Sequence, residues 1–438
     1  MAQTNATSAH RGFARYGAYV ATLQKLAREP RTAAAWDERA DAALDGQAGA
    51  ELRRVISLKT RRKFGAFFTG SNLAARLVTH CGPFNAQSVL HDPSLGMGDL
   101  LLAGAQKLPL GRTLADTLRQ WSRQLTGTDL HREFIEGAKL RLVLLARQRH
   151  GLKAAGVNSV AGLFPGIRVA DGLTQRAAFA RATNLLLNPP FVVAPAPADC
   201  LWAGGRITKA ASFVVTALER ARPGTELVAI LPDVLRSGSF SAQWRKRVEQ
   251  LAEVQLAEPY GIFDDTADVD VFLLRVTRRV ETQNPTPHPW TTATPPRTTT
   301  VADYFEVHVG RVVPHRDKES GPLRRYIHPR NIGVWTEVTR IFEKRRHEGL
   351  TYKPPFVVLR RTSRPGHPYR AAATVILGTK PVAVENHLIV CEPHDKSAAT
   401  CRALMEQLRT QRVNDFLDQR IRCRHLTVGA VAAIPVEL

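Results

Sequence analysis

The stretch Ser88–Leu108, SVLHDPSLGMGDLLLAGAQKL, decides the fold class of this 438-residue chain. Its first six residues form a short apolar run that predicts a strand, and the glycines of SLGMG predict a tight turn. The remainder, DLLLAGAQKL, has the apolar spacing of a helix. A strand that turns sharply into a helix is the repeating unit of α/β proteins.

The same alternation continues after this unit. Four further apolar runs predict strands, and the sequence REFIEGAKLRLVLLARQ after the first of them predicts a long helix. A later segment, ADVDVFLLRVTRR, is strongly β-patterned. Alternating strands and helices predict a parallel sheet with helices on both faces, whose ligands bind beyond the carboxyl ends of the strands. The four runs are LTGTDL from Leu125, GIRVADGL from Gly166, NLLLNPP from Asn184 and ELVAILP from Glu226.

Composition divides the chain into four predicted parts. Helical spacing in YGAYVATLQKLA and AELRRVISL predicts a helical N-terminal region over 1–60, followed by the α/β domain over 61–280. The Pro- and Thr-rich residues 281–300 predict a linker. Residues 301–438 contain the short strands FEVHVGRVV, PFVVLRR, ATVILG and VAVENHLIVCEP and one long helical stretch, so a smaller α+β domain is expected there.

The chain is strongly basic. It has 61 Lys and Arg against 39 Asp and Glu, a net charge of +22 and a pI near 10.5. Residues 311–370 contain 15 Lys and Arg against 5 Asp and Glu, which predicts one positively charged face in the C-terminal domain. A polyanion such as nucleic acid is the expected partner, although an Arg-rich genome would produce a similar composition.

Other function classes receive no support from the sequence. The five cysteines are scattered without CxxC spacing, so neither a zinc site nor a disulfide framework is expected, and the histidines have no metal-ligand spacing. The N-terminus has no signal-peptide pattern, and no stretch approaches the roughly 20 apolar residues of a membrane span. A cytoplasmic protein without metal or membrane partner is therefore expected.

Polar residues stand at successive strand ends. Asp92 and the glycines Gly96 and Gly98 follow the first predicted strand, where they suit either a ligand-binding loop or only a tight turn. Asp129 ends the second strand and can accept hydrogen bonds from ribose hydroxyls or cap the following helix. Asp171, followed by glycine, suits a turn after the third strand.

The fourth strand ends in the sequence Asn188-Pro189-Pro190-Phe191. The two prolines make this turn rigid and leave its carbonyl groups free as acceptors, and Asn188 adds a side-chain oxygen. Phe191 offers a flat ring for stacking. Convergent acceptors beside an aromatic ring predict a pocket for a planar amine such as the exocyclic amine of adenine.

Taken together, these strand ends resemble those of the N6-adenine DNA methyltransferases of type I and type IIG restriction-modification systems. The resemblance covers roughly residues 60–280. KFGAFFTGSNLAARLV, DPSLGMG, NPPF and GIFDDTADVDVFLLRV match family segments in order. Gly70 replaces a proline, Leu95 a cysteine, and Asn184 an acidic residue, while Asp99 occupies a position that is usually small or apolar.

The resemblance implies a Rossmann-like methyltransferase domain that uses S-adenosylmethionine (SAM) and flips an adenine out of double-stranded DNA. The catalytic turn would be Asn188, Pro189, Pro190 and Phe191, with Phe191 and Phe263 stacking on the target base. The implied cofactor-binding residues are Phe68, Thr69, Asp92, Pro93, Gly96, Gly98, Asp129, Leu130, Asp171, Gly172 and Asn188.

The C-terminal part resembles, more distantly, the target-recognition domains of the same enzymes. Its candidate DNA contacts include Arg324, Arg325, Arg360, Arg361 and Arg364. A separate restriction or defence subunit is a further expected partner. Three alternatives stay open at this point: methylation of RNA, methylation of a protein glutamine, and a non-catalytic DNA-binding subunit. A fused nuclease is not expected, because the short helical stretch before residue 60 has no carboxylate–lysine cluster.

Overall fold

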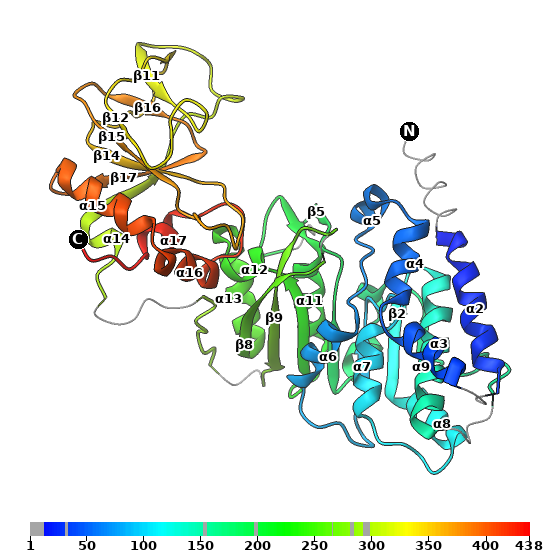
Figure 1. Ribbon diagram of the computed structural model, residues 1–438. Coiled ribbons are helices and arrows are strands. Elements are labelled where there is room, and N and C mark those ends of the chain that lie inside the picture. Colours follow the sequence, from blue (N-terminus) through cyan, green and yellow to red (C-terminus); the bar gives the residue numbers. More distant parts are fainter. Residues whose placement is uncertain are drawn as a thin grey trace. The chain divides into compact units, whose positions relative to one another are not determined.

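The computed structural model describes residues 13–30, 34–151, 156–196, 200–264, 266–280, 284–291 and 298–438. The protein is a mixed α/β protein that divides into two compact units (Figure 1). The first unit consists of Met1–Leu235 and Ser241–His288, and the second of Arg236–Phe240 and Pro289–Leu438. The division into four parts expected from the sequence stays a proposal.

A seven-stranded sheet forms the centre of the first unit, in the order β3-β2-β1-β4-β7-β9-β8. The first five of these strands pair in parallel, and β9 and β8 complete the sheet in antiparallel fashion. The strands are β1 (Leu90–Asp92), β2 (Leu125–Asp129), β3 (Ile167–Val169), β4 (Asn184–Leu187), β7 (Glu226–Pro232), β8 (Ala252–Ile262) and β9 (Asp270–Arg278). A small hairpin of β5 (Val193–Pro195) and β6 (Arg206–Thr208) follows β4.

The order of the strands reverses between β1 and β4. From β1 the chain proceeds outward to β2 and β3, and from β4 it proceeds in the other direction to β7. Helices that follow strands on the two sides of such a point diverge, and a crevice opens at the carboxyl ends of the two strands. The residues after β1 and β4, which include Asp92–Gly98 and Asn188–Phe191, therefore lie side by side.

Helices cover both faces of this sheet (Figure 1). The N-terminal helices α2 and α3 pack on α9, so α9 is buried on nearly all sides. Their bounds are α2 (Gly17–Arg28), α3 (Ala34–Leu44), α4 (Gln47–Val55), α5 (Leu58–Phe64), α6 (Ser71–Thr79), α7 (Asp99–Lys107), α8 (Leu114–Gln124), α9 (Arg132–His150), α10 (Arg176–Arg181), α11 (Lys209–Arg220), α12 (Asp233–Ser237) and α13 (Ala242–Leu251). No helix in the described ranges combines the length and the apolar character that crossing a membrane would require.

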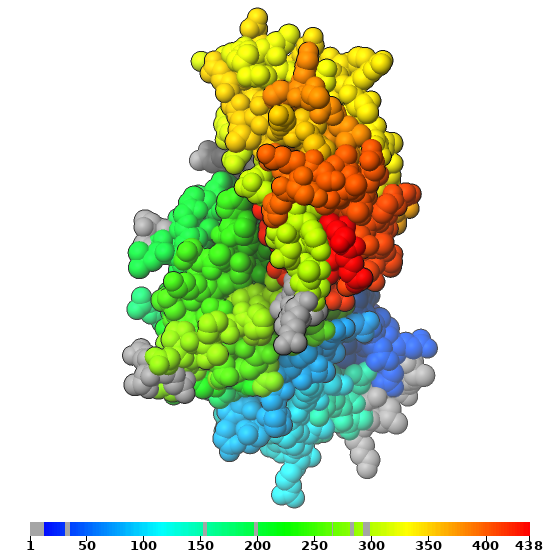
Figure 2. Space-filling model, turned by 90° about the vertical axis from the view of Figure 1, so that its left-hand side faces the viewer, coloured from blue at the N-terminus to red at the C-terminus, as the bar shows by residue number. Residues whose placement is uncertain are grey.

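The second unit contains two sheets and four short helices. One sheet has the order β10-β17-β14-β15-β12 and the other β13-β11-β16. In Figure 2 the yellow residues that include β11 lie at one end of this unit, away from the red C-terminal residues. Its elements are α14 (Val301–Tyr304), β10 (Phe305–Val309), β11 (Leu323–Ile327), β12 (Glu337–Val338), β13 (Lys344–Arg346), β14 (Phe356–Arg360), β15 (Ala373–Ile376), β16 (Val382–Val384), β17 (Leu388–Pro393), α15 (Ala398–Leu408), α16 (Gln411–Arg420) and α17 (Val428–Ala432).

The structure differs from the sequence-based expectations in three places. The expected strand VAVENHLIVCEP is two strands, β16 and β17, which belong to different sheets. The expected C-terminal helix is interrupted between α15 and α16. Trp290 lies in the expected linker, yet its side chain is buried and its carbonyl accepts a hydrogen bond from Arg236. Trp290 thus contributes packing contacts to a segment whose composition is otherwise typical of a linker.

Candidate functional site at the strand switch point

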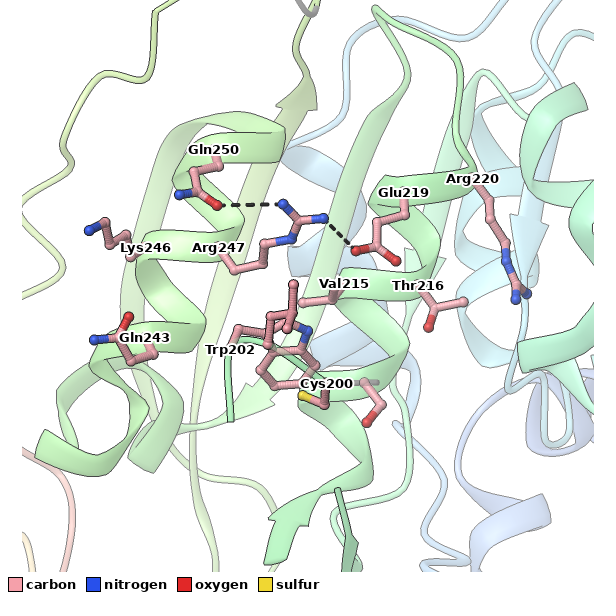
Figure 3. A pocket seen from close by; sticks show the side chains of 12 residues that line it. Cys200, Trp202, Val215, Thr216, Glu219, Arg220, Gln243, Lys246, Arg247 and Gln250 are labelled. Carbon is pink, nitrogen blue, oxygen red and sulfur yellow. Dashed lines mark hydrogen bonds and ion pairs between the residues drawn. The ribbon is translucent and has the colours of Figure 1, made fainter. Parts of the chain in front are cut away.

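A cavity of about 470 Å³ between α11 and α13 has none of the predicted site residues in its wall (Figure 3). Arg247 on α13 forms an ion pair with Glu219 on α11 at 2.7 Å and a hydrogen bond with Gln250 at 3.5 Å. The Arg247 guanidinium is thus bonded to side chains of both helices. Nothing in the wall of this cavity points to a particular chemistry.

The predicted residues gather instead around a cavity of about 380 Å³ at the switch point. It is lined by residues that follow all four strands from β1 to β4, together with residues 63–68 before α6. Among the described residues, no group of His, Cys, Asp and Glu has the arrangement of a metal site. The predicted residues in the wall are Phe68, Pro93, Gly96, Asp129, Leu130, Asp171, Gly172, Asn188 and Pro190.

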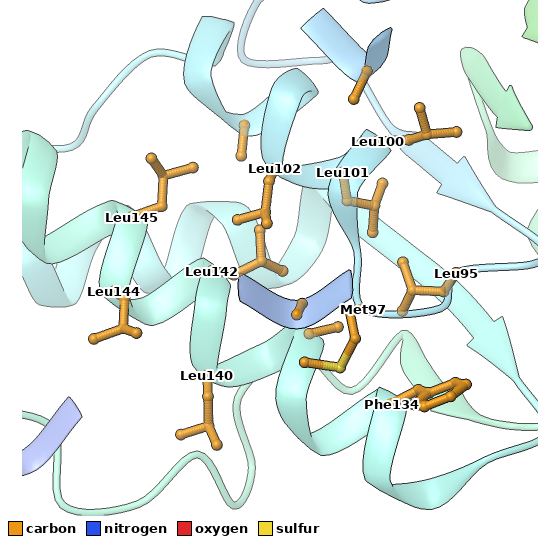
Figure 4. Close-up of a cluster of buried hydrophobic side chains, with 14 of the residues drawn as sticks. Leu95, Met97, Leu100, Leu101, Leu102, Phe134, Leu140, Leu142, Leu144 and Leu145 are labelled. Atoms are coloured by element: carbon orange, nitrogen blue, oxygen red, sulfur yellow. The ribbon is translucent and has the colours of Figure 1, made fainter. Parts of the chain in front are cut away.

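Two apolar side chains of the loop after β1 anchor the loop to the hydrophobic core. Leu95 and Met97 are buried in a cluster with side chains of α7 and α9 (Figure 4). Leu95, the residue in the position of the family cysteine, also donates its N–H to the carbonyl of Thr128 at 2.9 Å. The loop is therefore anchored to β2 and to the core, while Pro93, Ser94 and Gly96 face the cavity.

Asp92 is buried under this loop and is not part of the cavity wall. Its carboxyl group accepts hydrogen bonds from the Ser94 N–H at 2.9 Å and the Ser94 hydroxyl at 3.4 Å. Burial raises the pKa of Asp92 to about 8, because the protein interior disfavours the charged form. Asp92 thus helps to shape the loop, and its part in cofactor binding stays a proposal.

Asp129 connects the loop to the next helix. Its Oδ2 accepts from the Gly96 N–H at 3.0 Å, and its Oδ1 accepts from the His131 N–H at 2.9 Å. Burial raises the pKa of Asp129, and the bonds from His131 and Gly96 oppose that rise. A carboxylate oxygen has more than one acceptor site, so both oxygens can also face a ligand in the cavity. The neighbouring Leu130 is 67% exposed.

Gly172 has a steric reason to be glycine. A Cβ atom at this position would lie 1.8 Å from the carbonyl oxygen of Pro93. The preceding Asp171 accepts a hydrogen bond from the Leu173 N–H at 2.9 Å, which starts a short 3₁₀ turn over Gly172–Thr174. The close approach of these two loops closes one side of the cavity.

The turn after β4 presents two acceptors. The Asn188 side-chain amide donates to Thr69 Oγ1 at 2.9 Å, which directs its oxygen away from that contact. Within the described residues, neither the Asn188 side-chain oxygen nor the Pro189 carbonyl accepts a hydrogen bond. Phe191 and Phe263 meet edge to face, with ring centroids 5.5 Å apart. The structure thus brings the predicted catalytic and stacking residues together.

Phe68 separates this cavity from a second one of about 530 Å³. Thr69, Phe263 and Asp264 line the second cavity, and Arg53 of α4 extends toward Asp264, with 3.8 Å between their charged groups. Thr69 therefore contacts Asn188 from the side of the second cavity. The Phe68 side chain thus lies between the cavity bordered by the glycine loop and the cavity bordered by Phe263.

The contacts that hold this wall were not predicted. Asp99 accepts from the Gly70 N–H at 3.0 Å and pairs with the buried Arg141 of α9 at 2.8 Å. Arg141, only 1% exposed, also donates to the carbonyls of Ala43, Leu44 and Met97. The signal was present in the two charges: Asp99 departs from the family pattern, and Arg141 interrupts an apolar run.

Other cavity residues were also missed. Phe64, His131, Phe134, Lys209 and Phe213 line the cavity, and Phe134 packs edge to face on Phe68 with ring centroids 5.1 Å apart. His131 and Phe134 follow the predicted Leu130 closely in the chain, whereas Lys209 and Phe213 belong to α11 and are far in sequence from every predicted site residue. Only the folded chain brings these residues to the cavity.

The candidate DNA contacts of the second unit differ in their surroundings. Arg360 donates to the carbonyls of Pro329 and Ile332, and burial lowers its pKa. Arg361 donates to the carbonyl of Asn386 at 3.2 Å. Arg324 and Arg325 lie on β11, and Arg364 is exposed in a loop.

No protein-family model matches the chain, and no curated protein sequence matches it. Among solved structures it is similar to the type IIL restriction-modification enzyme MmeI in complex with DNA, at a TM-score of 0.56 and 11% identity over 88% of this chain and 70% of MmeI. It is also similar to the type IIG restriction endonuclease BpuSI, at a TM-score of 0.43 and 13% identity over 92% of this chain and 61% of BpuSI.

A third similar structure is the M protein of the type I restriction enzyme EcoKI, with a TM-score of 0.36 and 19% identity over 49% of this chain and 44% of that protein. The chain thus spans less than two thirds of BpuSI and less than half of the EcoKI protein. At 11% identity, the likeness to MmeI establishes a shared fold. The solved structures that this chain resembles include restriction-modification enzymes, as the sequence predicts.

Proposed function

We propose that this protein is a SAM-dependent methyltransferase that modifies the N6 amine of adenine in double-stranded DNA, in a bacterial modification or defence system. The observation with most weight is the pair of unbonded acceptors, the Asn188 side-chain oxygen and the Pro189 carbonyl, beside a cavity bordered by the glycine loop and Asp129. The fold shared with MmeI supports the same reaction class.

The cavity suits SAM in size and chemistry. Its volume of about 380 Å³ lies within the range of about 300–1,000 Å³ that small-molecule sites occupy. The Asp129 carboxylate would receive hydroxyl donors of a ribose, Asp171 would face the adenine of the cofactor, and Phe68 would pack on it. When bound, SAM supplies a methyl group on a positively charged sulfur.

The residues of the chain position the accepting amine. Asn188 and Pro189 would accept the two amine hydrogens, which turns the nitrogen lone pair out of conjugation with the ring. Because Pro189 and Pro190 have fixed φ angles, the acceptors are held before the substrate arrives. Phe191 and Phe263 would buttress the base, since stacking is worth roughly 1–3 kcal/mol per base.

Two of the departures from the family pattern have structural roles. Leu95 fills a buried position in the core, and Asp99 pairs with Arg141 and receives the Gly70 N–H. Neither change removes a group from the cavity wall. This supports a working cofactor site over a degenerate one.

Double-stranded DNA is the proposed substrate because of the net charge of +22 and the excess of Lys and Arg over residues 311–370. MmeI, whose fold the chain shares, was solved in complex with DNA. A separate restriction or defence subunit is part of the same proposal.

Asn188→Ala tests the proposal directly. The variant should transfer tritiated methyl groups from SAM to duplex DNA at a rate lower by on the order of 10²–10³-fold, because it removes a preorganised acceptor. Its SAM affinity, measured by calorimetry, should be largely retained, because the other cofactor-binding residues of the cavity wall remain. Asn158→Ala is the matched control, since Asn158 is exposed and contacts Gln24 and Arg28 through its backbone carbonyl.

Retained turnover in Asn188→Ala would refute the assignment of the catalytic turn. Wild-type protein that methylates RNA or a glutamine-containing protein but not DNA would support the corresponding alternative. Long-read sequencing of methylated bases in a host with and without the gene would identify the recognised DNA site.

A further inference from the structure

Strands β11 and β13 of the second unit form an antiparallel two-stranded ladder of three residue pairs. Leu323 lies opposite Arg346, Arg324 opposite Arg345, and Arg325 opposite Lys344. Five of the six side chains are therefore cationic. We call this pair of strands the basic ribbon.

Like charges directly opposite each other destabilise a β ladder. Two of the three pairs in the basic ribbon are of this kind. A protein that only needed a stable hairpin here would have gained from a carboxylate in one of the strands. The arrangement is favourable when an anionic partner lies along the ribbon.

The two faces of the basic ribbon differ in their charge. On one face Arg345 pairs with Glu319 at 2.7 Å and its guanidinium lies over the ring of Tyr326. On the other face, Arg325 and Lys344 have no carboxylate within ion-pair distance in the part of the chain that the structure describes. The second face also includes Leu323 and Arg346 and continues along β11 to Ile327, which is buried in the core of the unit. Leu323, Lys344 and Arg346 are exposed and Arg325 is half-buried, so the exposed end of this face is the part available to an anion.

Phe342 lies two residues before β13 and is 85% exposed. Its neighbours are both held in place: Ile341 packs against the core of the unit, and Glu343 accepts hydrogen bonds from His328 and from Asn331. The loop therefore presents a phenyl ring to solvent from a fixed backbone. These two hydrogen bonds also engage the carboxylate of Glu343, which follows Phe342 in the chain.

From these observations we infer that the basic ribbon lies in a groove of double-stranded DNA, with Arg325 and Lys344 at phosphates and Phe342 against the bases. A two-stranded β ribbon fits the major groove, and exposed aromatic residues stack on or insert between bases. In Figure 1, β11 of the ribbon lies at the end of the second unit away from α16 and α17. The inference rests on the proposed DNA substrate and identifies the surface of the second unit that binds the DNA.

The charge part of the inference is tested with Arg325→Ala/Lys344→Ala in the full chain. Binding to a 30-bp duplex of mixed sequence is measured by fluorescence anisotropy over a series of KCl concentrations. Loss of two phosphate contacts should reduce the slope of log affinity against log salt by about 2 and weaken binding on the order of tenfold.

The matched control is Arg402→Ala/Arg412→Ala. It removes the same two charges from exposed positions of the same unit, but these guanidinium groups are paired with Glu337 and Glu437. Its salt slope should equal that of the wild type. An equal fall in slope for both double variants would overturn the ribbon in favour of general electrostatics.

The aromatic part is tested with Phe342→Ala and Phe342→Trp on the same duplex. Phe342→Ala should bind on the order of tenfold more weakly at every salt concentration, with an unchanged salt slope, because stacking involves no counterion release. Phe342→Trp should restore the affinity. Wild-type affinity in Phe342→Ala would overturn the base contact.

These outcomes are distinct from a failure of the proposed function. Methyl transfer to DNA together with unchanged duplex binding by Arg325→Ala/Lys344→Ala would overturn the ribbon alone. Ribbon-dependent duplex binding without methyl transfer would refute the methyltransferase and leave the ribbon intact. Binding of the wild type to RNA or to an acidic protein, but not to the duplex, would overturn the ribbon as a DNA-binding surface.

Discussion

Asp129 shows how one side chain serves two purposes at the residue scale. The sequence allowed either a ribose acceptor or a helix cap, and the structure places the carboxylate in the cavity wall while bonding it to the N–H groups of Gly96 and His131. The two roles are compatible because each oxygen has more than one acceptor site. The ligand-binding role itself stays a proposal.

Asp129→Asn separates these two roles. The amide oxygen still accepts one of the backbone bonds, whereas the charge that would attract ribose hydroxyls is removed. We expect SAM affinity to fall on the order of tenfold or more, since hydrogen bonds to charged groups are worth about 1.5–3 kcal/mol. Calorimetry measures the affinity and thermal denaturation checks the fold. An unchanged SAM affinity would mean that Asp129 only stabilises the loop, through its hydrogen bonds with Gly96 and His131.

Helix α9 shows how elements position the site at the next scale. It packs between the sheet and the N-terminal helices, so Arg141 in its middle is buried and its charge must be compensated. Asp99, at the start of α7, supplies that compensation and also holds Gly70 at the start of α6. Three helices thus fix the segment that contains Phe68 and Thr69.

Asp99→Asn should weaken this arrangement strongly. It leaves the Arg141 charge buried without its carboxylate, and breaking a buried pair costs about 3–5 kcal/mol. We expect a loss of that size in the free energy of unfolding in urea, and weaker SAM binding. In the control Asp116→Asn, which breaks an exposed pair with Arg119, the loss should stay below about 1 kcal/mol.

An Asp99→Asn variant as stable as the control would contradict the structural role of the pair. Asp99→Ala/Arg141→Met offers a second check, because replacing a whole buried pair by apolar groups is often neutral or stabilising. This double variant should regain part of the lost stability, because the buried charge is gone, while the carbonyls of Ala43, Leu44 and Met97 lose their Arg141 donor. Its SAM affinity should stay reduced, since the Gly70 N–H loses its acceptor.

The whole molecule consists of two units with separate hydrophobic cores. One core lies among residues 13–273, and the cores of the second unit lie among residues 301–436. The proposed cofactor cavity is lined by residues of the first unit alone, and the basic ribbon belongs to the second. The proposed catalytic and DNA-holding roles are therefore divided between the units.

A chain that ends at His288 tests this division. Because the first unit keeps its own core and the whole cavity wall, we expect SAM binding to be retained by calorimetry. Duplex binding by anisotropy should be lost, since the basic ribbon is removed. A truncated chain with a native circular dichroism spectrum but no SAM affinity would show that the cavity depends on the second unit.

Much of the first unit was predictable because its signals are local. The predicted strands from β1 to β4 and β7 are present, and the predicted residues at their ends meet at one cavity, since parallel strands in this order end at the same edge. β8 was missed, although residues 252–256 alternate between exposed and more buried side chains as an edge strand does. The burial of Asp92 under the loop was not predictable, because it depends on the folded chain, and its expected role in cofactor binding stays a proposal.

The sequence by itself determined the α/β class, the strand ends and the rigid turn at Asn188–Phe191, because each depends on residues that are consecutive in the chain. Only the tertiary structure decided that Asn188 bonds to Thr69, that Asp99 pairs with Arg141, and that two strands place five cations opposite or beside one another. Those contacts join residues from 19 to 119 positions apart, and their energies arise from burial and charge that only the folded chain creates.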